Sequence, residues 1–229
     1  MPKKSMPKRK VRKDKKQDQK IKALEKFVYK TIENKQLNER VTNSTVPSTG
    51  FTASGFFQTA IGAADGDQSG SGAAARIGNS LTLMNQRMNY TLEASAVDGY
   101  NRMRIIIAES VDGNVTLNLS DILLYSDYSV YNNLVFVSPY TTKTDTNRRY
   151  KIHSDRVYEL NAKARGATAH HKENIKYREG GSPGKVINFD GTLSDFPTNH
   201  NLLIFAISDS TVSPHPRISV AVRSTYKDA

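Results

Sequence analysis

The strongest constraint on the fold of this chain is a series of short strand-like segments separated by turns. From residue 80 onward, apolar and β-branched runs alternate with clusters of Gly, Asn, Asp and Ser, without a helical apolar period. The strands are expected at residues 80–95, 102–110, 134–140, 148–161, 171–181, 185–191, 201–210 and 217–229, with a short helix within 119–133. This pattern predicts an all-β fold, an antiparallel sandwich or barrel.

Positive charge is concentrated at the start of the chain. The whole chain has 33 basic and 22 acidic residues, a net charge of +11. Residues 1–26 contain 12 of the basic and 3 of the acidic residues, so they net +9 and the rest of the chain nets only +2. The sequence therefore indicates a nearly neutral body that carries a polycationic segment.

The density of this charge favours binding to a nucleic-acid backbone, which Lys and Arg neutralise without reading sequence. The residues expected to make these contacts are Lys3, Lys4, Lys8, Arg9, Lys10, Arg12, Lys13, Lys15, Lys16 and Lys20. Residues 3–16 also resemble a nuclear localisation signal, whose partner would be a host nuclear import receptor. A membrane partner is disfavoured because no lipidation motif or aromatic wedge accompanies the charge, and a merely solubilising tail is the remaining alternative.

The first fifty residues are divided by composition. Residues 1–13 are expected to be a disordered basic arm. Residues 14–37 are expected to form an amphipathic basic helix, because Ile21, Leu24, Val28 and Ile32 follow a helical spacing. Residues 38–50 are expected to be a linker, and residues 51–229 the β-domain.

No recognised catalytic motif is present, so the chain is expected not to be an enzyme. It has no cysteine, which excludes thiolate metal sites and cysteine nucleophiles. The calcium-loop pattern that begins at Asp65 has Arg76 where a bidentate Glu is required. His170 and His171 are adjacent on an expected strand, so they point to opposite faces and do not share an ion. We therefore assign no catalytic residue, no cofactor and no metal ligand from the sequence.

The same order of segments resembles a family of small virus coat proteins. A basic arm, a helix, a Ser/Thr/Gly-rich stretch and a β-domain are similar to the single jelly-roll capsid proteins of satellite tobacco necrosis virus and of small circular single-stranded DNA viruses. The residues that carry the resemblance are Arg76, Gly78 and Asn79 before the first long strand, Arg102 and Arg104 in the next strand, and Asp155 to Leu160 in a later one. The arm here is longer and richer in lysine than the satellite arm.

This resemblance implies an eight-stranded antiparallel jelly roll that assembles with itself. Sixty copies would form a T=1 icosahedral shell, and the basic arms would bind a packaged single-stranded DNA or RNA genome. The protein would then be found in the virion and in the host cytoplasm or nucleus. Some members bind calcium between subunits, and such a site is left open here with no ligand assigned. The clustered tyrosines are expected at subunit contacts: Tyr125, Tyr128, Tyr131 and Tyr140.

Two other function classes stay open from the sequence. A non-viral β-sandwich with a basic tail would bind nucleic acid as a monomer or a small oligomer. A jelly-roll lectin or carbohydrate-active enzyme would need a concave aromatic groove with paired carboxylates, and it would leave the basic arm unexplained.

Overall fold

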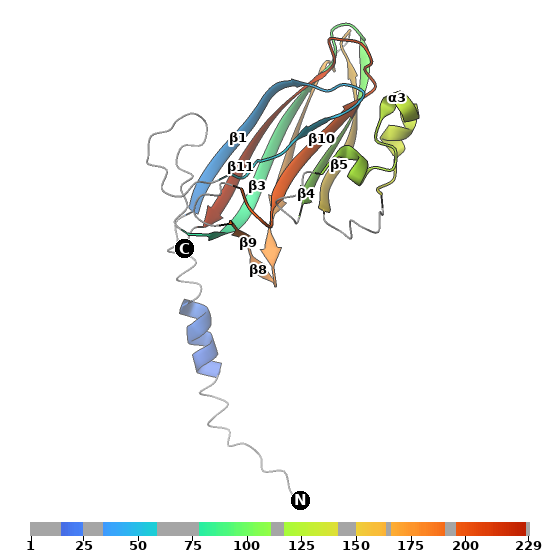
Figure 1. The fold of residues 1–229 in the computed structure, drawn as a ribbon. Coiled ribbons are helices and arrows are strands. Elements are labelled where there is room, and N and C mark those ends of the chain that lie inside the picture. Colours follow the sequence, from blue (N-terminus) through green and yellow to red (C-terminus); the bar gives the residue numbers. More distant parts are fainter. Residues whose placement is uncertain are drawn as a thin grey trace, which may run out of the picture.

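The computed structural model describes residues 15–24, 34–58, 78–110, 117–141, 150–163, 166–190 and 196–227. Two β-sheets pack face to face, and a short helical connection that includes α3 lies on the outer side of one of them (Figure 1). The strands are β1 (Asn34–Thr45), β2 (Phe51–Ala53), β3 (Ser80–Glu93), β4 (Tyr100–Ser110), β5 (Tyr150–Asn161), β6 (Thr168–Lys176), β7 (Arg178–Glu179), β8 (Ser182–Pro183), β9 (Lys185–Asn188), β10 (Asn201–Ser208) and β11 (Arg217–Lys227).

The strand order identifies the sandwich as a jelly roll. One sheet has the order β1-β11-β3-β6, with β9 also paired to β3, and the other has the order β2-β10-β4-β5. All of these neighbours are antiparallel. When the short strands β7, β8 and β9 are set aside, eight strands interleave between the two sheets as in a double Greek key. The expected all-β jelly roll is confirmed.

Strands β4 and β10 each contain an unbroken apolar run, residues 105–108 and 202–207, because both of their faces are covered there. On β4, Ile105 and Ile107 point into the core between the sheets, while Ile106 and Ala108 point to a second buried cluster on the outer side. Strand β10 does the same, with Phe205 on the outer side. An unbroken apolar run is the pattern that two-sided burial requires.

Strand β3 alternates imperfectly because of a bulge. Its partner β11 pairs Thr225 with Asn85 and Tyr226 with Leu83, so Met84 is an extra residue. Before the bulge, odd-numbered residues such as Leu83 are buried, and after it, even-numbered residues from Gln86 onward are buried. The bulge therefore turns the Gln86 amide into the sandwich. On the other side of the β1-β11-β3-β6 sheet, the outward-pointing side chains of the described strands are exposed or half-buried.

The connection between β4 and β5 covers the outer side of the β2-β10-β4-β5 sheet. It contains α2 (Leu119–Ile122), α3 (Tyr128–Tyr131) and a 3-10 helix, η1 (Asn132–Val137). The short helix expected within 119–133 is confirmed, but the strand expected at 134–140 is wrong. Val135 and Phe136 are both buried while their neighbours Leu134 and Val137 are exposed, and a strand cannot bury two successive residues on one face.

The N-terminal boundaries also differ from the sequence prediction. Residues 15–24 are helical, as expected, while residues 25–33 lie outside the described part. Strand β1 occupies Asn34–Thr45, so the helix expected up to residue 37 and the linker expected at 38–50 are wrong there. Leu37 and Val41 are spaced by four, which suits a helix and a strand equally, and pairing with β11 selects the strand.

Within the described residues, no helix is long and apolar enough to cross a membrane.

The second apolar cluster should make the helical connection part of the cooperative core. Phe205→Ala removes a fully buried ring that packs between β10 and the connection. We expect it to lower the free energy of unfolding by about 3–5 kcal/mol. Chemical denaturation measures this. The control Val212→Ala changes an exposed loop residue and should stay within about 0.5 kcal/mol of the wild type; equal effects of the two would contradict the packing described.

Candidate functional site

The described part of the basic segment is a short, fully exposed helix. Residues 15–24 carry four lysines, Lys15, Lys16, Lys20 and Lys22, and one acidic residue, Asp18. The apolar residues Ile21 and Leu24 of this helix are 53% and 62% exposed. Of the ten residues predicted to bind nucleic acid, three are therefore placed on this exposed helix, and the seven from Lys3 to Lys13 lie outside the described residues.

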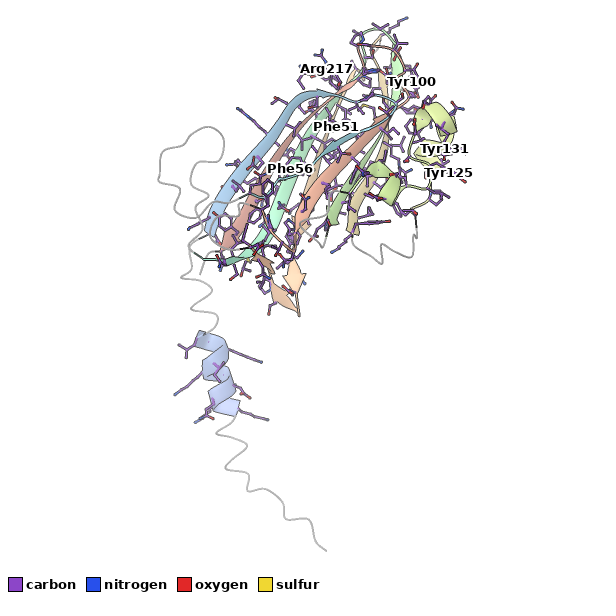
Figure 2. The ribbon with its side chains drawn as sticks, in the orientation of Figure 1. Phe51, Phe56, Tyr100, Tyr125, Tyr131 and Arg217 are labelled. Carbon is purple, nitrogen blue, oxygen red and sulfur yellow. The ribbon has the colours of Figure 1, made fainter. Side chains whose placement is uncertain are left out.

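An exposed apolar surface lies on the connection between β4 and β5. Six of the fourteen large apolar side chains that are exposed in the described residues belong to this connection: Leu124, Val130, Tyr131, Leu134, Val137 and Tyr140. We call this set the apolar surface. Figure 2 shows Tyr125 and Tyr131 beside α3, and their ring centroids lie 5.1 Å apart. A cluster of this kind is what protein interfaces bury.

Two arginines of β4 hold this connection against the sheet. Arg104 forms a two-pronged ion pair with Asp155 of β5, with Nε–Oδ1 at 3.0 Å and Nη2–Oδ2 at 2.7 Å. The same guanidinium donates to the carbonyl oxygens of Val135 (2.6 Å) and Ser138 (3.1 Å). Arg102 lies over the Phe136 ring, 5.0 Å from its centroid. Planar guanidinium groups suit both tasks, so the apolar surface rests on a fixed support.

Tyr140 belongs to the same arrangement. Its hydroxyl donates to Asp155 Oδ2 at 2.7 Å, although the side chain is 42% exposed. Burial and the neighbouring Asp155 carboxylate raise the pKa of Tyr140 to about 12. The resemblance drew attention to Arg104 and Asp155 separately, and the structure places them in one ion pair.

A buried polar cluster lies between the two sheets and centres on Glu109. Lys185 Nζ donates to Glu109 Oε1 at 2.6 Å, and His200 Nδ1 lies 3.1 Å from the same oxygen. His153 Nε2 lies 2.9 Å from the other carboxylate oxygen. His200 Nε2 lies 3.1 Å from Gln86 Oε1, so the cluster reaches from β4 across to β3. Hydrogen bonds of this kind tie the two sheets together at a fixed register.

Two bulges aim side chains into this cluster. The bulge in β3 turns Gln86 inward, where Tyr177 donates to its Oε1 at 2.6 Å. On β5, the pairing with β4 passes from Ser154 to Ile152, so His153 is the extra residue. Bulges commonly redirect a side chain in this way.

The charges of the cluster follow from its surroundings. Burial by itself would raise the pKa of Glu109, but the hydrogen bonds from His153, His200 and Lys185 outweigh it and hold the pKa well below its usual range. Burial lowers the pKa of His200, and the neighbouring Glu109 carboxylate opposes that shift. Glu109 is therefore ionised and fully partnered.

This cluster does not have the properties of a metal or catalytic site. Lys185 already places a cation on Glu109 Oε1, where a metal ion would have to bind. Among the described residues, no group of three His, Asp or Glu side chains is arranged to hold a metal ion. Glu109, His153 and His200 are all nearly inaccessible to solvent, so a substrate cannot reach them.

The histidine pair on β6 behaves as its position predicts. His170 is exposed and lies 2.9 Å from Thr91 Oγ1, whereas His171 is partly buried and lies 3.2 Å from Glu173 Oε2. The two rings are on opposite faces of the sheet, as expected for neighbours on a strand. The calcium-loop pattern from Asp65 to Arg76 lies outside the described residues.

Sequence reasoning missed the Glu109 cluster. His153 and His200 belong to no motif, and their common partner Glu109 is 44 and 91 residues away in the chain. One signal was available: Glu109 directly follows the apolar run of residues 105–108, and a carboxylate in such a position needs buried partners.

The comparisons with known proteins identify no family. No family model and no curated protein matches the chain. It is similar to the solved structure of Desmodium yellow mottle tymovirus, with 8% identity, a TM-score of 0.39, and coverage of 86% of this chain and 88% of that chain. The empty head of turnip yellow mosaic virus gives 8% identity, a TM-score of 0.36, and coverage of 86% and 82%. Both are virus structures but neither is satellite tobacco necrosis virus, so that closer resemblance stays a prediction.

Arg104→Lys should loosen the apolar surface while preserving the sandwich. A lysine keeps the charge but cannot form the two-pronged pair and reach two carbonyl oxygens at once. We expect a loss of about 1.5–3 kcal/mol in stability, with faster hydrogen exchange confined to the amides of residues 132–138. Unchanged exchange in this range would contradict the support described. Arg178→Lys is the matched control, since Arg178 is exposed on β7 and lies outside this connection.

Glu109→Gln should destabilise the protein in a pH-dependent way. The change leaves Lys185 and the two histidines without their carboxylate, which we expect to cost about 3–5 kcal/mol at pH 7. Because the pKa of Glu109 is lowered by folding, its contribution is complete above pH 4.5 and is lost as the pH falls further. Urea denaturation at several pH values should show the wild type approaching the variant below pH 4.5. A constant gap between them would rule out this role.

Proposed function

We propose that this protein is a viral capsid protein that assembles into a closed shell and packages a single-stranded nucleic acid. The observation that carries the proposal is the division of charge. A jelly-roll body that nets only +2 follows a segment of residues 1–26 that nets +9. A shell subunit needs a body that tolerates close neighbours of the same charge and a separate element that attracts phosphate.

The jelly-roll body is a sandwich of two sheets. Its two sheets are held together by a continuous apolar core and by the Glu109 cluster. The fold alone does not define a function, since lectins and other proteins share it. The basic segment is what favours the capsid over the lectin or the carbohydrate-active enzyme.

The apolar surface supports assembly of identical copies. Six exposed apolar side chains lie on a connection that Arg102 and Arg104 hold in place. A preformed surface loses little conformational entropy when a neighbour covers it. Individual contacts in a closed shell can be weak because many form together.

We propose a T=1 shell of sixty copies, with each basic segment on the inside. Sixty segments of +9 provide about 540 positive charges, enough to neutralise much of a genome on the order of a thousand nucleotides. This attraction is electrostatic and independent of sequence, so it suits DNA and RNA alike. A nuclear import receptor is a second proposed partner of residues 3–16.

Deletion of residues 1–20 should separate folding from packaging. The deletion removes all ten predicted nucleic-acid contacts and ends before strand β1. We expect an unchanged circular dichroism spectrum and unfolding midpoint, but a loss of the nuclease-resistant nucleic acid that copurifies with the full chain. The ratio of absorbance at 260 and 280 nm measures this content.

The matched control replaces residues 1–20 with the same residues in scrambled order. It should package as much nucleic acid as the wild type, because phosphate attraction depends on charge and not on order. Equal packaging by the deletion variant would refute the role of the segment. Packaging by the wild type but not by the scrambled variant would show specific recognition instead. Protein that binds nucleic acid only as a monomer or a small oligomer would favour the non-viral binding module.

A further inference from the structure

The solvent-exposed side of the β1-β11-β3-β6 sheet is strongly basic. Its outward-pointing basic residues are Arg40, Arg87, Lys172, Lys176, Arg217, Arg223 and Lys227. We call this set the basic sheet face. Glu93 is the one outward-pointing acidic residue on these four strands, so the face nets +6. The chain beyond residue 26 nets +2, which leaves −4 for everything else in it.

The strand register places these charges in rows across the sheet. The central row runs Asn38, Arg223, Arg87, Asn174 from β1 to β6. The row on one side of it consists of Arg40, Ala221, Asn89 and Lys172. The row on the other side consists of Gln36, Thr225, Asn85 and Lys176. Basic groups thus alternate with amides and hydroxyls, which also donate to phosphate oxygens.

The centre of the face holds two guanidinium groups directly opposite each other. Arg87 and Arg223 are register partners, and like charges in that position destabilise a sheet. Within the described residues, neither of them forms an ion pair. Arg223 Nε donates to Asn38 Oδ1 at 3.0 Å, which orients that guanidinium and leaves its outer nitrogens available. A bound anion would relieve this repulsion.

We propose that the basic sheet face is a second nucleic-acid-binding surface, which contacts the phosphate backbone of a single strand independently of the basic N-terminal segment. The overall neutrality of the body hides this surface, because the opposing acidic residues lie elsewhere. On the four strands no Phe, Tyr or Trp side chain points outward, and His170 is the one outward-pointing ring, so the face supplies little platform for stacking bases. Binding should therefore be sensitive to salt and indifferent to sequence.

Nucleic acid fits this face better than an anionic membrane does. The outward positions between the basic residues are mainly Asn, Gln, Thr, Ser and His. Among the described strands of this sheet, Val186 of β9 is the one exposed large apolar side chain, and a single valine does not anchor a protein in a lipid interface. A sheet face that is rich in hydrogen-bond donors matches a backbone of phosphates and sugars.

One end of this surface lies where the chain enters the sheet. Asn34, the first residue of edge strand β1, pairs with Lys227 of the basic sheet face. Arg217 lies at the opposite end of β11 (Figure 2). The inference deepens the proposed function and rests on it only for the place of the face inside a shell, since backbone binding can be measured without assembly.

The test compares two double variants of the full chain that lose the same charge. Arg87→Gln with Arg223→Gln removes the centre of the face. Arg156→Gln with Arg178→Gln removes two exposed arginines from β5 and β7, away from the face. Binding of fluorescein-labelled oligo(dT) is measured by anisotropy over a range of salt concentrations. Loss of two phosphate contacts should reduce the slope of log K against log salt by about 1.4 in the face variant only.

The outcomes separate this proposal from the proposed function. Equal slopes for the two double variants would overturn the face as a binding surface, even if both variants form shells. A reduced slope in the face variant would support the face even if no shell forms, and that absence would count against the capsid alone. A second measurement, made on the same two variants, is binding to vesicles of phosphatidylserine and phosphatidylcholine. A loss of vesicle binding with unchanged oligo(dT) binding would reject the proposal in favour of a membrane surface.

Discussion

The burial of β4 and β10 on both faces is the interaction on which the rest of the structure depends. Their inner side chains build the core between the sheets, and their outer side chains build the cluster under the helical connection. Because the connection is needed to cover Phe205 and Ile106, it is held close to the sheet, and its remaining apolar side chains face solvent. The candidate assembly surface is thus a direct consequence of how the two central strands are buried.

The two sheets consequently differ in what they offer to a partner. The β2-β10-β4-β5 sheet is covered and presents apolar groups through its covering connection, whereas the β1-β11-β3-β6 sheet is bare and presents charge. Arg87 and Arg223 show that this charge is not balanced locally. A subunit of a nucleic-acid-containing shell needs both kinds of surface. We propose that the apolar surface faces neighbouring copies and that the basic sheet face adds to the phosphate binding of residues 1–26.

Most of the β-domain could be predicted from the sequence, because its strands carry apolar runs between clear turns. Strand β1 could not, because Leu37 and Val41 are its only large apolar residues and their spacing fits either period. The 3-10 helix at Val135 and Phe136 was missed because a short apolar run gives no period to distinguish it. The Glu109 cluster and the basic sheet face depend on partners far apart in sequence, and the bulges at Met84 and His153 change the inward and outward positions on their strands.

Electron cryo-microscopy of the purified recombinant protein shows whether the full chain closes into a shell around nucleic acid. We expect uniform closed particles with sixty jelly rolls, and internal density that is lost or reduced in particles of the chain without residues 1–20. Monomers or small open oligomers, at every salt concentration and with single-stranded nucleic acid added, would contradict this expectation.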